Sequence, residues 1–390
     1  MGVPLAYRSK KLNTEITYDI AVAGGGLAGL ALAIQGARAG YRVVLIEKEK
    51  YPFHKVCGEY VSLESWDFLE ELGLPLSEMN LPVIRKLIVS APGGRVLEHM
   101  LPLGGFGISR YNLDSQLASL AAKNGVNVME KTKVRNINFD QEIFTLDCDG
   151  FSIRARSVAG AFGKRSNLDT AWQRKFTLQK ANKLNNYIGV KYHIHFDFPE
   201  DTIALHNFKN GYCGISKIEG NRYCLCYLTT AYNLKSANND IKKMESDILC
   251  RYPWLQKIFQ GAEFLPDFPV VISQISFSRR TQVEKHVLMI GDSSGMISPL
   301  CGNGMSMALH GSKIAFEKID NYLHQKNTLQ QMEEEYQHAW SRTFDSRLRT
   351  GRIIQRFFGS ALLSNLLIST LKPFPGLVNR IISETHGQPF

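Results

Sequence analysis

The spacing of apolar and polar residues predicts a strand–helix–strand unit near the start of this chain of 390 residues. Residues 20–23 form a short apolar run, which is typical of a strand buried on both faces of a parallel sheet. Alanine and leucine at helical spacing predict a helix over residues 27–39, and Gly40 ends it. A second buried strand is expected over residues 42–46. This order of elements indicates a parallel α/β domain.

A different pattern, in which apolar and polar residues alternate, predicts an antiparallel sheet in the middle of the chain. The alternation runs through four segments, 187–198, 202–208, 211–218 and 222–230. Residues 81–107 are also strand-like and contain two glycine turn signals. His193 and His195 would share one face of a strand. We expect them at solvent-facing positions, with the lining of a substrate cavity as the alternative.

The turn between the first strand and helix carries a nucleotide-binding motif. Gly24, Gly26 and Gly29 have the G-x-G-x-x-G spacing, in which the glycines allow a tight turn, a close approach of backbone to pyrophosphate, and close helix packing. The pyrophosphate would then lie at the positive end of the helix. Glu47, at the end of the second strand, is expected to accept hydrogen bonds from ribose hydroxyls. An acid there disfavours NADP but permits NAD or FAD.

A second glycine-rich turn decides between these dinucleotides. An apolar run over residues 287–290 leads into Asp292, and a helix is expected from about Gly304. An aspartate at a strand end can hold polyol hydroxyls, and the backbone N–H groups of residues 302–305 can face an anionic ring edge. A ribityl chain and a flavin have those two features, so the sequence predicts FAD.

Composition and charge narrow the function classes. With 44% hydrophobic residues, the chain can bury a full core. Its net charge of +10 suits an anionic cofactor, a nucleic acid or a membrane surface, and we expect no nucleic acid because no recognition motif accompanies the charge. The seven scattered cysteines are typical of a reduced, cytoplasmic protein. Cys224 and Cys226 would share a strand face, where apolar packing is expected rather than a metal site.

Basic charge gathers in the last fifty residues, beside an uncharged segment over residues 357–371. Asp345 and Glu384 are the acids of this tail, and its basic residues are Arg342, Arg347, Arg349, Arg352, Arg356, Lys372 and Arg380. Fifteen residues are short for a membrane span. The segment is expected either to cap the substrate domain or to lie on anionic lipid, peripheral to the inner face of a membrane.

The two glycine motifs, taken with "PFHKVCGEYVS" at residues 52–62, carry a family resemblance. Over residues 18–320 the chain resembles FAD-dependent oxidoreductases built like p-hydroxybenzoate hydroxylase, and within them the geranylgeranyl reductase family. The resemblance implies an α/β fold, in which a Rossmann-like FAD-binding domain with a mostly parallel sheet is interleaved with an antiparallel-sheet substrate domain. The FAD-binding domain would comprise residues 1–80, 108–165 and 268–325, and the substrate domain residues 81–107 and 166–267. A helical region over 326–390 would follow.

By the same resemblance, Arg110 would lie near the FAD phosphates and flavin chain, and the backbone of Val134 against the adenine. Lys55 would point away from Cys57, toward the phosphates. The full set of expected cofactor-binding residues is Gly24, Gly26, Leu27, Ala28, Gly29, Glu47, Lys48, Lys55, Cys57, Gly58, Arg110, Val134, Gly163, Asp292, Pro299, Gly302, Asn303, Gly304 and Met305.

The resemblance also implies a reaction, in which reduced flavin passes hydride to a carbon–carbon double bond of a lipophilic, isoprenoid-like substrate. Cys57 is the expected catalytic residue, as proton donor, and packing beside the flavin is the alternative. A monooxygenase, or less readily a halogenase, is the alternative function. Phe162 stands where the family has an aspartate that helps to hold the nicotinamide, so the reductant is either NADPH, bound weakly, or a small electron-transfer protein.

Overall fold

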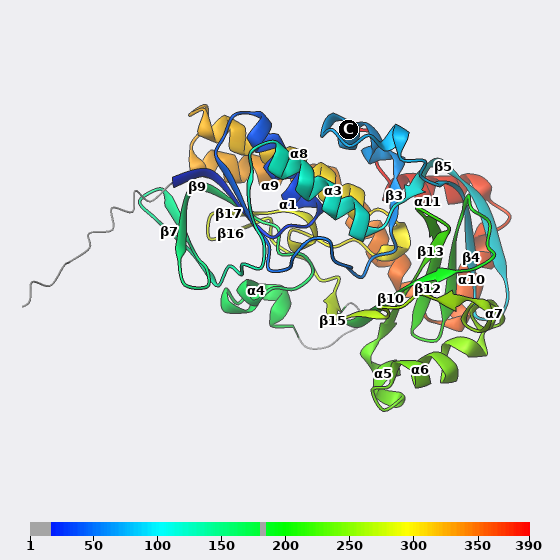
Figure 1. The fold of residues 1–390 in the computed structure, drawn as a ribbon. Coiled ribbons are helices and arrows are strands. Elements are labelled where there is room, and N and C mark those ends of the chain that lie inside the picture. Colours follow the sequence, from blue (N-terminus) through cyan, green and yellow to red (C-terminus); the bar gives the residue numbers. More distant parts are fainter. Residues whose placement is uncertain (1–16, 180–184) are drawn as a thin grey trace, which may run out of the picture.

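The structure, a computed structural model, describes residues 17–179 and 185–390 and contains two large sheets (Figure 1). The first sheet has the order β16-β17-β9-β1-β2-β6. Its strands β17, β9, β1, β2 and β6 run parallel, and a β7–β8 hairpin extends β9. The bounds are β1 (Thr17–Ala23), β2 (Val43–Ile46), β6 (Asn127–Met129), β7 (Asn136–Asp140), β8 (Ile143–Asp147), β9 (Ser152–Gly160), β16 (Val283–Glu284) and β17 (Val287–Met289).

Helices cover one face of this first sheet because their apolar stripes need a partner. The helices are α1 (Leu27–Arg38), α3 (Arg110–Lys123), α8 (Gly304–Leu323) and α9 (Leu329–Phe357). Helix α1 packs between α3 and α8, and its core residues include Leu30 and Ile34. The hairpin and the short α4 (Asn167–Ala171) cover the other face around Phe144 and Leu168. A further short helix, α2 (Trp66–Glu71), packs on the same core as α1.

The second sheet has the order β14-β10-β13-β12-β11-β4-β5-β3, with β15 also paired to β10. All its pairs are antiparallel except β11 with β4. The bounds are β3 (Tyr60–Ser62), β4 (Val83–Ser90), β5 (Val96–Gly107), β10 (Asn185–His195), β11 (Thr202–Phe208), β12 (Gly211–Ile218), β13 (Arg222–Thr230), β14 (Glu263–Phe264) and β15 (Val270–Ser276).

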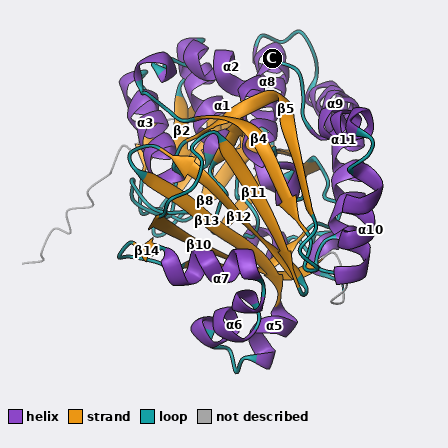
Figure 2. Cartoon of the chain, turned by 90° about the vertical axis from the view of Figure 1, so that its right-hand side faces the viewer, coloured by secondary structure: helices purple, strands orange, loops and turns teal. Residues whose placement is uncertain are grey.

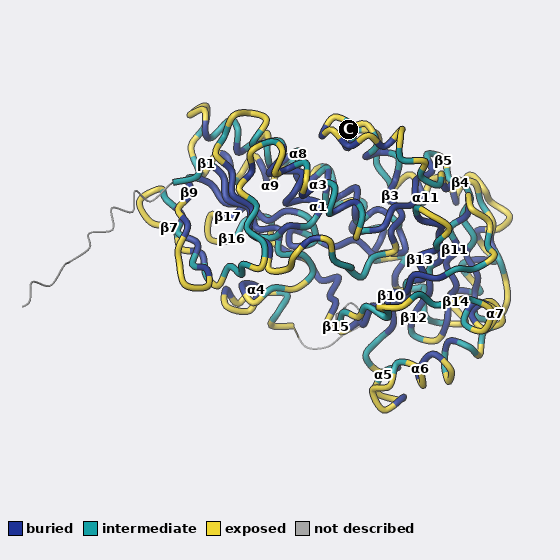
Figure 3. Tube along the Cα trace, viewed as in Figure 1, coloured by how far each residue is buried: buried dark blue, intermediate teal, exposed yellow. Residues whose placement is uncertain are grey.

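One face of the second sheet packs on three helices, α5 (Ala231–Ser236), α6 (Ile241–Asp247) and α7 (Pro253–Gly261). Residues such as Val190, Ile215 and Leu225 fill this interface. Because side chains alternate along a strand, their neighbours point to the opposite face, toward the first sheet. Figure 3 shows both sheets as mostly buried segments and the exposed residues on the helices and connecting loops.

The last two helices lie along the second sheet. Helices α10 (Ala361–Leu371) and α11 (Pro375–Thr385) pack against β5, and Figure 2 shows them with α9 along one edge of the molecule. Residues 357–371, expected as one uncharged helix, are interrupted between α9 and α10. Gly359 has a φ of +81°, and a Cβ there would lie 2.9 Å from the backbone nitrogen of Gly211. The close approach of two backbones therefore ends α9.

The fold class predicted from the sequence is confirmed, with two strands assigned differently. Residues 60–62 and 270–276 were expected in the FAD-binding domain, but as β3 and β15 they pair with the second sheet. The physical reason is that β3 follows directly on the loop that passes between the two sheets, and β15 completes the edge of β10. Neither pairing has a local signal in the sequence.

Candidate active site

A cavity of about 830 Å³ lies between the two sheets. Its lining comes from the glycine turn before α1, the loop over residues 53–60, the turn that leads into α8, and the free face of the second sheet. Every residue predicted to bind the cofactor lines this cavity except Asn303. The Asn303 side chain is fully buried elsewhere and donates from Nδ2 to the carbonyl oxygen of Thr385 at 2.8 Å.

The glycine turn has the geometry that a pyrophosphate requires. Gly24 has a φ of +114°, and a Cβ there would lie 2.3 Å from the carbonyl oxygen of Ala161. A Cβ on Gly29 would lie 2.1 Å from the carbonyl oxygen of Gly24. Beside Gly26, in contrast, a Cβ would meet only Arg110, at 3.9 Å, so the backbone there is open to the cavity. The first N–H groups of α1 therefore face a space that an anionic group can enter.

Glu47 lines the cavity and also fixes the glycine turn. One carboxylate oxygen accepts from the backbone N–H of Gly25 at 2.8 Å, and the other accepts from the N–H of Glu49 at 3.0 Å. Each oxygen keeps a lone pair for a further donor, such as a ribose hydroxyl. The position therefore suits the role that the sequence predicted for this residue.

A buried ion-pair group lies beside the glycine turn. Arg110 donates to both carboxylate oxygens of Asp114, at 2.7 and 2.8 Å, and Lys55 Nζ donates to the same group at 2.9 Å. Burial raises the pKa of Asp114, but Arg110 and Lys55 hold it below its usual value. Lys55 also donates to the carbonyl oxygen of Gly25. Two cations against one anion leave net positive charge here, which favours a pyrophosphate.

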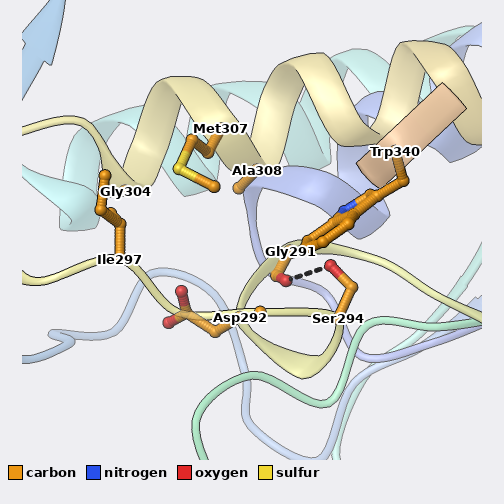
Figure 4. Close-up of a pocket in the computed structure, with 9 residues that line it drawn as sticks. Gly291, Asp292, Ser294, Ile297, Gly304, Met307, Ala308 and Trp340 are labelled. Atoms are coloured by element: carbon orange, nitrogen blue, oxygen red, sulfur yellow. Dashed lines mark hydrogen bonds between the residues drawn. The ribbon is translucent and has the colours of Figure 1, made fainter. Parts of the chain in front are cut away.

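The Asp292 turn is held from behind by aromatic packing (Figure 4). Trp340 of α9 faces Ala308 and the turn, and a Cβ on Gly295 would lie 2.7 Å from the indole ring. Ser294 donates from its hydroxyl to the carbonyl oxygen of Gly291 at 2.8 Å. Only about 10 Å³ of space remains behind the turn. The turn is thus rigidly supported, with Asp292 at the boundary of the large cavity.

The loop that contains Cys57 is tied down through its backbone. Three successive carbonyl oxygens each accept a side-chain hydrogen bond, and two of the three donors belong to the second sheet. The bonds run from Lys164 Nζ to Val56 (2.9 Å), from Cys224 Sγ to Cys57 (3.3 Å) and from Ser216 Oγ to Gly58 (3.3 Å). Because the main chain is held on one side, the Cys57 side chain is presented to the cavity that it lines.

The next residue, Glu59, is the centre of a buried charge cluster that the sequence did not predict. Glu59 is fully buried and has a φ of +57°. Its carboxylate accepts from Lys191 Nζ at 2.6 Å, from the backbone N–H of Arg110 at 2.8 Å, and lies 2.6 Å from His193 Nε2. Burial raises the pKa of Glu59, but the charge of Lys191 and the His193 contact outweigh it and lower the pKa to about 2.

The expectation that His193 faces solvent is wrong. His193 and Lys191 alternate on β10 and point to the free face of the sheet, where the Glu59 loop covers them. His195 is hydrogen-bonded to the carbonyl oxygen of Asn221 at the strand end. The available signal was the pair Lys191–His193, since two polar residues at alternate positions of a strand in the middle of a sheet need a buried partner.

Cys224 lies close enough to Glu59 and His193 to resemble a metal site. One ligand atom from each of these three residues falls within 4.8 Å of the others. The Lys191 ammonium, however, donates to the same carboxylate at 2.6 Å, and a positive charge there repels a cation. The arrangement therefore favours charge pairing over metal binding.

His54 completes the polar end of the cavity. Its ring stacks on Tyr111 with the ring centres 4.6 Å apart, and meets His193 edge-on at 5.2 Å. Its Nδ1 is buried and has no hydrogen-bond partner among the described residues. Burial, and then the charge of Lys191, lower the pKa of His54 to about 4. The imidazole is therefore neutral at pH 7.

The free face of the second sheet forms an apolar wall opposite the glycine turn. This wall consists of Gly189, Ile203, Leu205, Tyr212, Gly214, Leu228 and Ile275. Phe162, also in the lining, packs edge-on against Trp172 with the ring centres 5.9 Å apart. The cavity thus joins a polar region at the glycine turns to the apolar wall of the second sheet. Cys57, His54 and Glu59 also lie in its lining.

The comparisons with known proteins agree with this geometry. The model of the family described as "FAD binding domain" matches residues 17–339. Conditioned medium factor receptor 1 of Dictyostelium discoideum is 26% identical over 373 residues, which are 85% of this chain and 68% of that protein. Digeranylgeranylglycerophospholipid reductase of Methanococcus vannielii is 22% identical over 349 residues, covering 84% of this chain and 83% of that protein.

Solved structures share the fold at low identity. The flavin-dependent brominase Bmp2 superposes with a TM-score of 0.77 at 17% identity, over 95% of this chain and 93% of its own. A geranylgeranyl bacteriochlorophyll reductase-like protein from Thermoplasma acidophilum superposes with a TM-score of 0.72 at 18% identity, over 93% and 91%. Since the family match covers most of the chain and includes both turns that face the cavity, this protein belongs to the FAD binding domain family and is an FAD-dependent oxidoreductase.

Proposed function

We propose that this flavoprotein reduces carbon–carbon double bonds of a lipophilic, isoprenoid-like substrate. The observation that carries the proposal is the continuity of the cavity, which runs from the FAD motifs to the apolar wall of the second sheet and has Cys57 in its lining. An apolar wall suits a hydrocarbon chain, because burial of its surface drives binding. The name of the Methanococcus relative, a digeranylgeranylglycerophospholipid reductase, agrees with this substrate class.

Each residue around the cavity then has a defined task. Bound FAD, once reduced, supplies the hydride. Glu47, the α1 N-terminus and the Arg110–Lys55 pair would hold the dinucleotide, and Asp292 would accept hydrogen bonds from its polyol chain. The Cys57 thiol donates the proton that accompanies hydride transfer, and its loop is fixed by the hydrogen bonds to its backbone.

The reductant in this proposal is a small electron-transfer protein. Phe162 gives the cavity an apolar aromatic surface. Members of the family that this chain resembles have an aspartate at this position, so a carboxylate that could contact a nicotinamide is missing there. A protein that delivers electrons one at a time does not need such a contact.

The test uses the variants Cys57→Ser and Cys57→Ala, with Cys226→Ser as the matched control, because Cys226 is a second thiol in the lining of the same cavity. Protein reduced anaerobically with dithionite is mixed with geranylgeranyl substrate, and flavin oxidation is followed in a single turnover. We expect full FAD content in all variants and rates slowed on the order of 10²-fold for the Cys57 variants alone. Unchanged rates in both Cys57 variants would mean that this side chain only packs beside the flavin.

A monooxygenase is the second candidate, because the fold is shared with a probable FAD-dependent monooxygenase from Pseudomonas aeruginosa, at a TM-score of 0.70 and 16% identity. That likeness concerns the fold alone. Fast NADPH oxidation coupled to oxygen uptake would favour the monooxygenase, whereas saturation of the substrate without oxygen would favour the reductase. Mass spectrometry of the product separates the two by the mass of two hydrogens against that of one oxygen.

A further inference from the structure

Helix α10 is apolar on two opposite sides. Ile368 and Leu371 are buried against the second sheet. On the other side, Leu362, Leu363 and Leu366 are exposed to 84%, 40% and 61%. An ordinary surface helix has polar residues on its outer face. The sequence left open whether this segment caps the substrate domain or lies on lipid. The inner side of α10 packs on the second sheet, whereas its outer side has no partner among the described residues.

The exposed apolar surface continues onto both neighbouring helices. Phe374, before α11, is 58% exposed, and Leu377 in α11 is 43% exposed. Ile353, near the end of α9, is 51% exposed. The three helices follow one another along the same edge of the molecule in Figure 2. We call the exposed residues Ile353, Leu362, Leu363, Leu366, Phe374 and Leu377 the C-terminal apolar face.

Basic residues accompany this face. Arg349 and Arg356 are exposed and flank Ile353 at helical spacing, and Lys372 is exposed between α10 and α11. Within residues 17–179 and 185–390, no ion pair neutralises any of these three cations. Burial, and then the charge of Arg279, lower the pKa of Arg352, which shows that arginines crowd together here. Asp345 and Glu384 are the acids nearby, and Glu384 pairs with Arg380.

The geometry of the helices argues for contact along a surface. None of the described helices is by itself long and apolar enough to cross a bilayer, and α10 and α11 pass such a test only together, across a bend of 115°. The inner sides of both helices are packed on the protein through Ile368, Val378 and Ile382. The outer sides of α10 and α11 are therefore available to lipid.

From these observations we propose that the C-terminal apolar face docks on the surface of an anionic phospholipid bilayer. The leucines of α10 and Phe374 would enter the boundary between headgroups and acyl chains, and the cations of α9 and Lys372 would contact lipid phosphates. An exposed apolar patch with a basic rim has this complementarity, and it is uncommon on a protein without a partner.

Docking in this orientation would bring the bilayer close to the active-site cavity. The inner residues of α10 and α11, Ile368, Leu371 and Val378, belong to the same core cluster as Leu205 and Leu228 of the apolar wall. A layer of packed apolar side chains then separates lipid from the cavity. This last step rests on the proposed function, because it concerns the route of a lipophilic substrate, whereas bilayer docking does not depend on it.

Co-sedimentation of the full chain with vesicles tests the docking. Vesicles of phosphatidylcholine with phosphatidylglycerol are compared with phosphatidylcholine alone, at low and high salt. We expect binding to the anionic vesicles that weakens with salt. The variant Leu362→Asp/Leu366→Asp should lose at least tenfold in partition, since two apolar anchors become charges. The variant Arg349→Gln/Arg356→Gln/Lys372→Gln should lose severalfold on anionic vesicles only.

Two control variants make the same changes in charge elsewhere on the surface. Leu178→Asp/Phe151→Asp replaces two exposed apolar residues of the first half of the chain. Lys123→Gln/Lys235→Gln/Lys326→Gln removes three exposed positive charges. Both should bind vesicles like the wild type, and FAD content and melting temperature confirm that all variants are folded.

Three results would overturn the proposal. One is binding that does not prefer anionic vesicles, and another is equal loss in the control variants. The third is a dimer in light scattering that Leu362→Asp/Leu366→Asp dissociates while the wild type ignores vesicles, because a second copy would then cover this face. Reduction of detergent-solubilised substrate is measured alongside, so that a failure of the proposed function is seen separately from a failure of docking.

Discussion

At the scale of single residues, Asp292 offers a direct measure of how the chain holds FAD. Asp292→Ala would remove the charge-assisted hydrogen bond that we expect to the polyol chain, which should weaken FAD binding by roughly 1.5–3 kcal/mol, or about 10- to 150-fold in Kd. FAD titration of the apoprotein by flavin fluorescence measures the change. Asp149→Ala, an exposed carboxylate paired with Arg135, is the control and should leave the Kd unchanged. Equal affinity of the Asp292 variant and wild type would contradict the assigned role.

Phe162 leads to a second prediction at this scale. Because this residue would offer a nicotinamide an apolar surface without a carboxylate, NADPH should reduce the bound flavin more slowly than about 1 per second, the lower end of ordinary turnover. Anaerobic stopped-flow absorbance at saturating NADPH measures this rate, and dithionite serves as the control that the flavin is reducible. Faster reduction would show that NADPH can serve as the electron donor although Phe162 stands in place of the aspartate of the family.

The sequence predicted residues whose role follows from a short local motif, and it missed residues whose contacts join distant parts of the chain. Gly24, Gly29 and Glu47 were predicted because a glycine turn between a strand and a helix fixes its own geometry within about thirty residues. Glu59 and Lys191 were missed because they pair across 132 positions of sequence, and no periodicity links them. The buried position of the Asn303 side chain could not be predicted either, because its contact with Thr385 depends on where the last helix packs.

At the scale of elements, the strand β12 allows substrate binding to be tested separately from FAD binding. Gly214 lies in its apolar wall, and a Cβ there would meet nothing closer than Leu205, at 3.4 Å. A protein with a larger side chain at this position should therefore fold, and the side chain would occupy part of the cavity. Gly214→Phe should retain full FAD content and lose at least tenfold in the rate at which substrate oxidises reduced flavin. Gly376→Phe, at an exposed position where a Cβ would meet nothing within 4 Å, is the control for the same replacement outside the cavity.

A Gly214→Phe protein that loses FAD and substrate turnover together would contradict this division of the cavity. The prediction rests on strands that the sequence identified, since β11 to β13 are long segments rich in apolar residues, and the structure buries most of their positions on both faces. The short β3 and the edge strand β15 could not be assigned, because a three-residue strand has no pattern and an edge pairing depends on the tertiary fold.

At the scale of the whole molecule, the Glu59 cluster connects the two halves of the protein. Glu59 directly follows the Cys57 loop, whereas Lys191 and His193 belong to β10 of the second sheet. The same contact therefore joins the sheet to the loop that carries the proposed proton donor. A buried ion pair of this kind adds little net stability over an apolar pair, but it is costly to break on one side.

The last prediction concerns that cost and its dependence on pH. Glu59→Gln leaves the Lys191 ammonium buried without its anion and should lower the free energy of unfolding by roughly 3–5 kcal/mol at pH 6, whereas Glu59→Gln/Lys191→Met should recover most of it.

Because the pKa of Glu59 is lowered from 4.5 to about 2 in the folded state, its contribution to stability is fully present above about pH 4.5 and is lost as the pH falls toward 2. The stability gap between wild type and Glu59→Gln should therefore narrow between about pH 4.5 and pH 2. Urea unfolding across this range measures the gap, and the double variant shows the pH dependence of all other groups. A single variant as stable as wild type, or a gap that stays constant with pH, would mean that the cluster does not hold the two halves together.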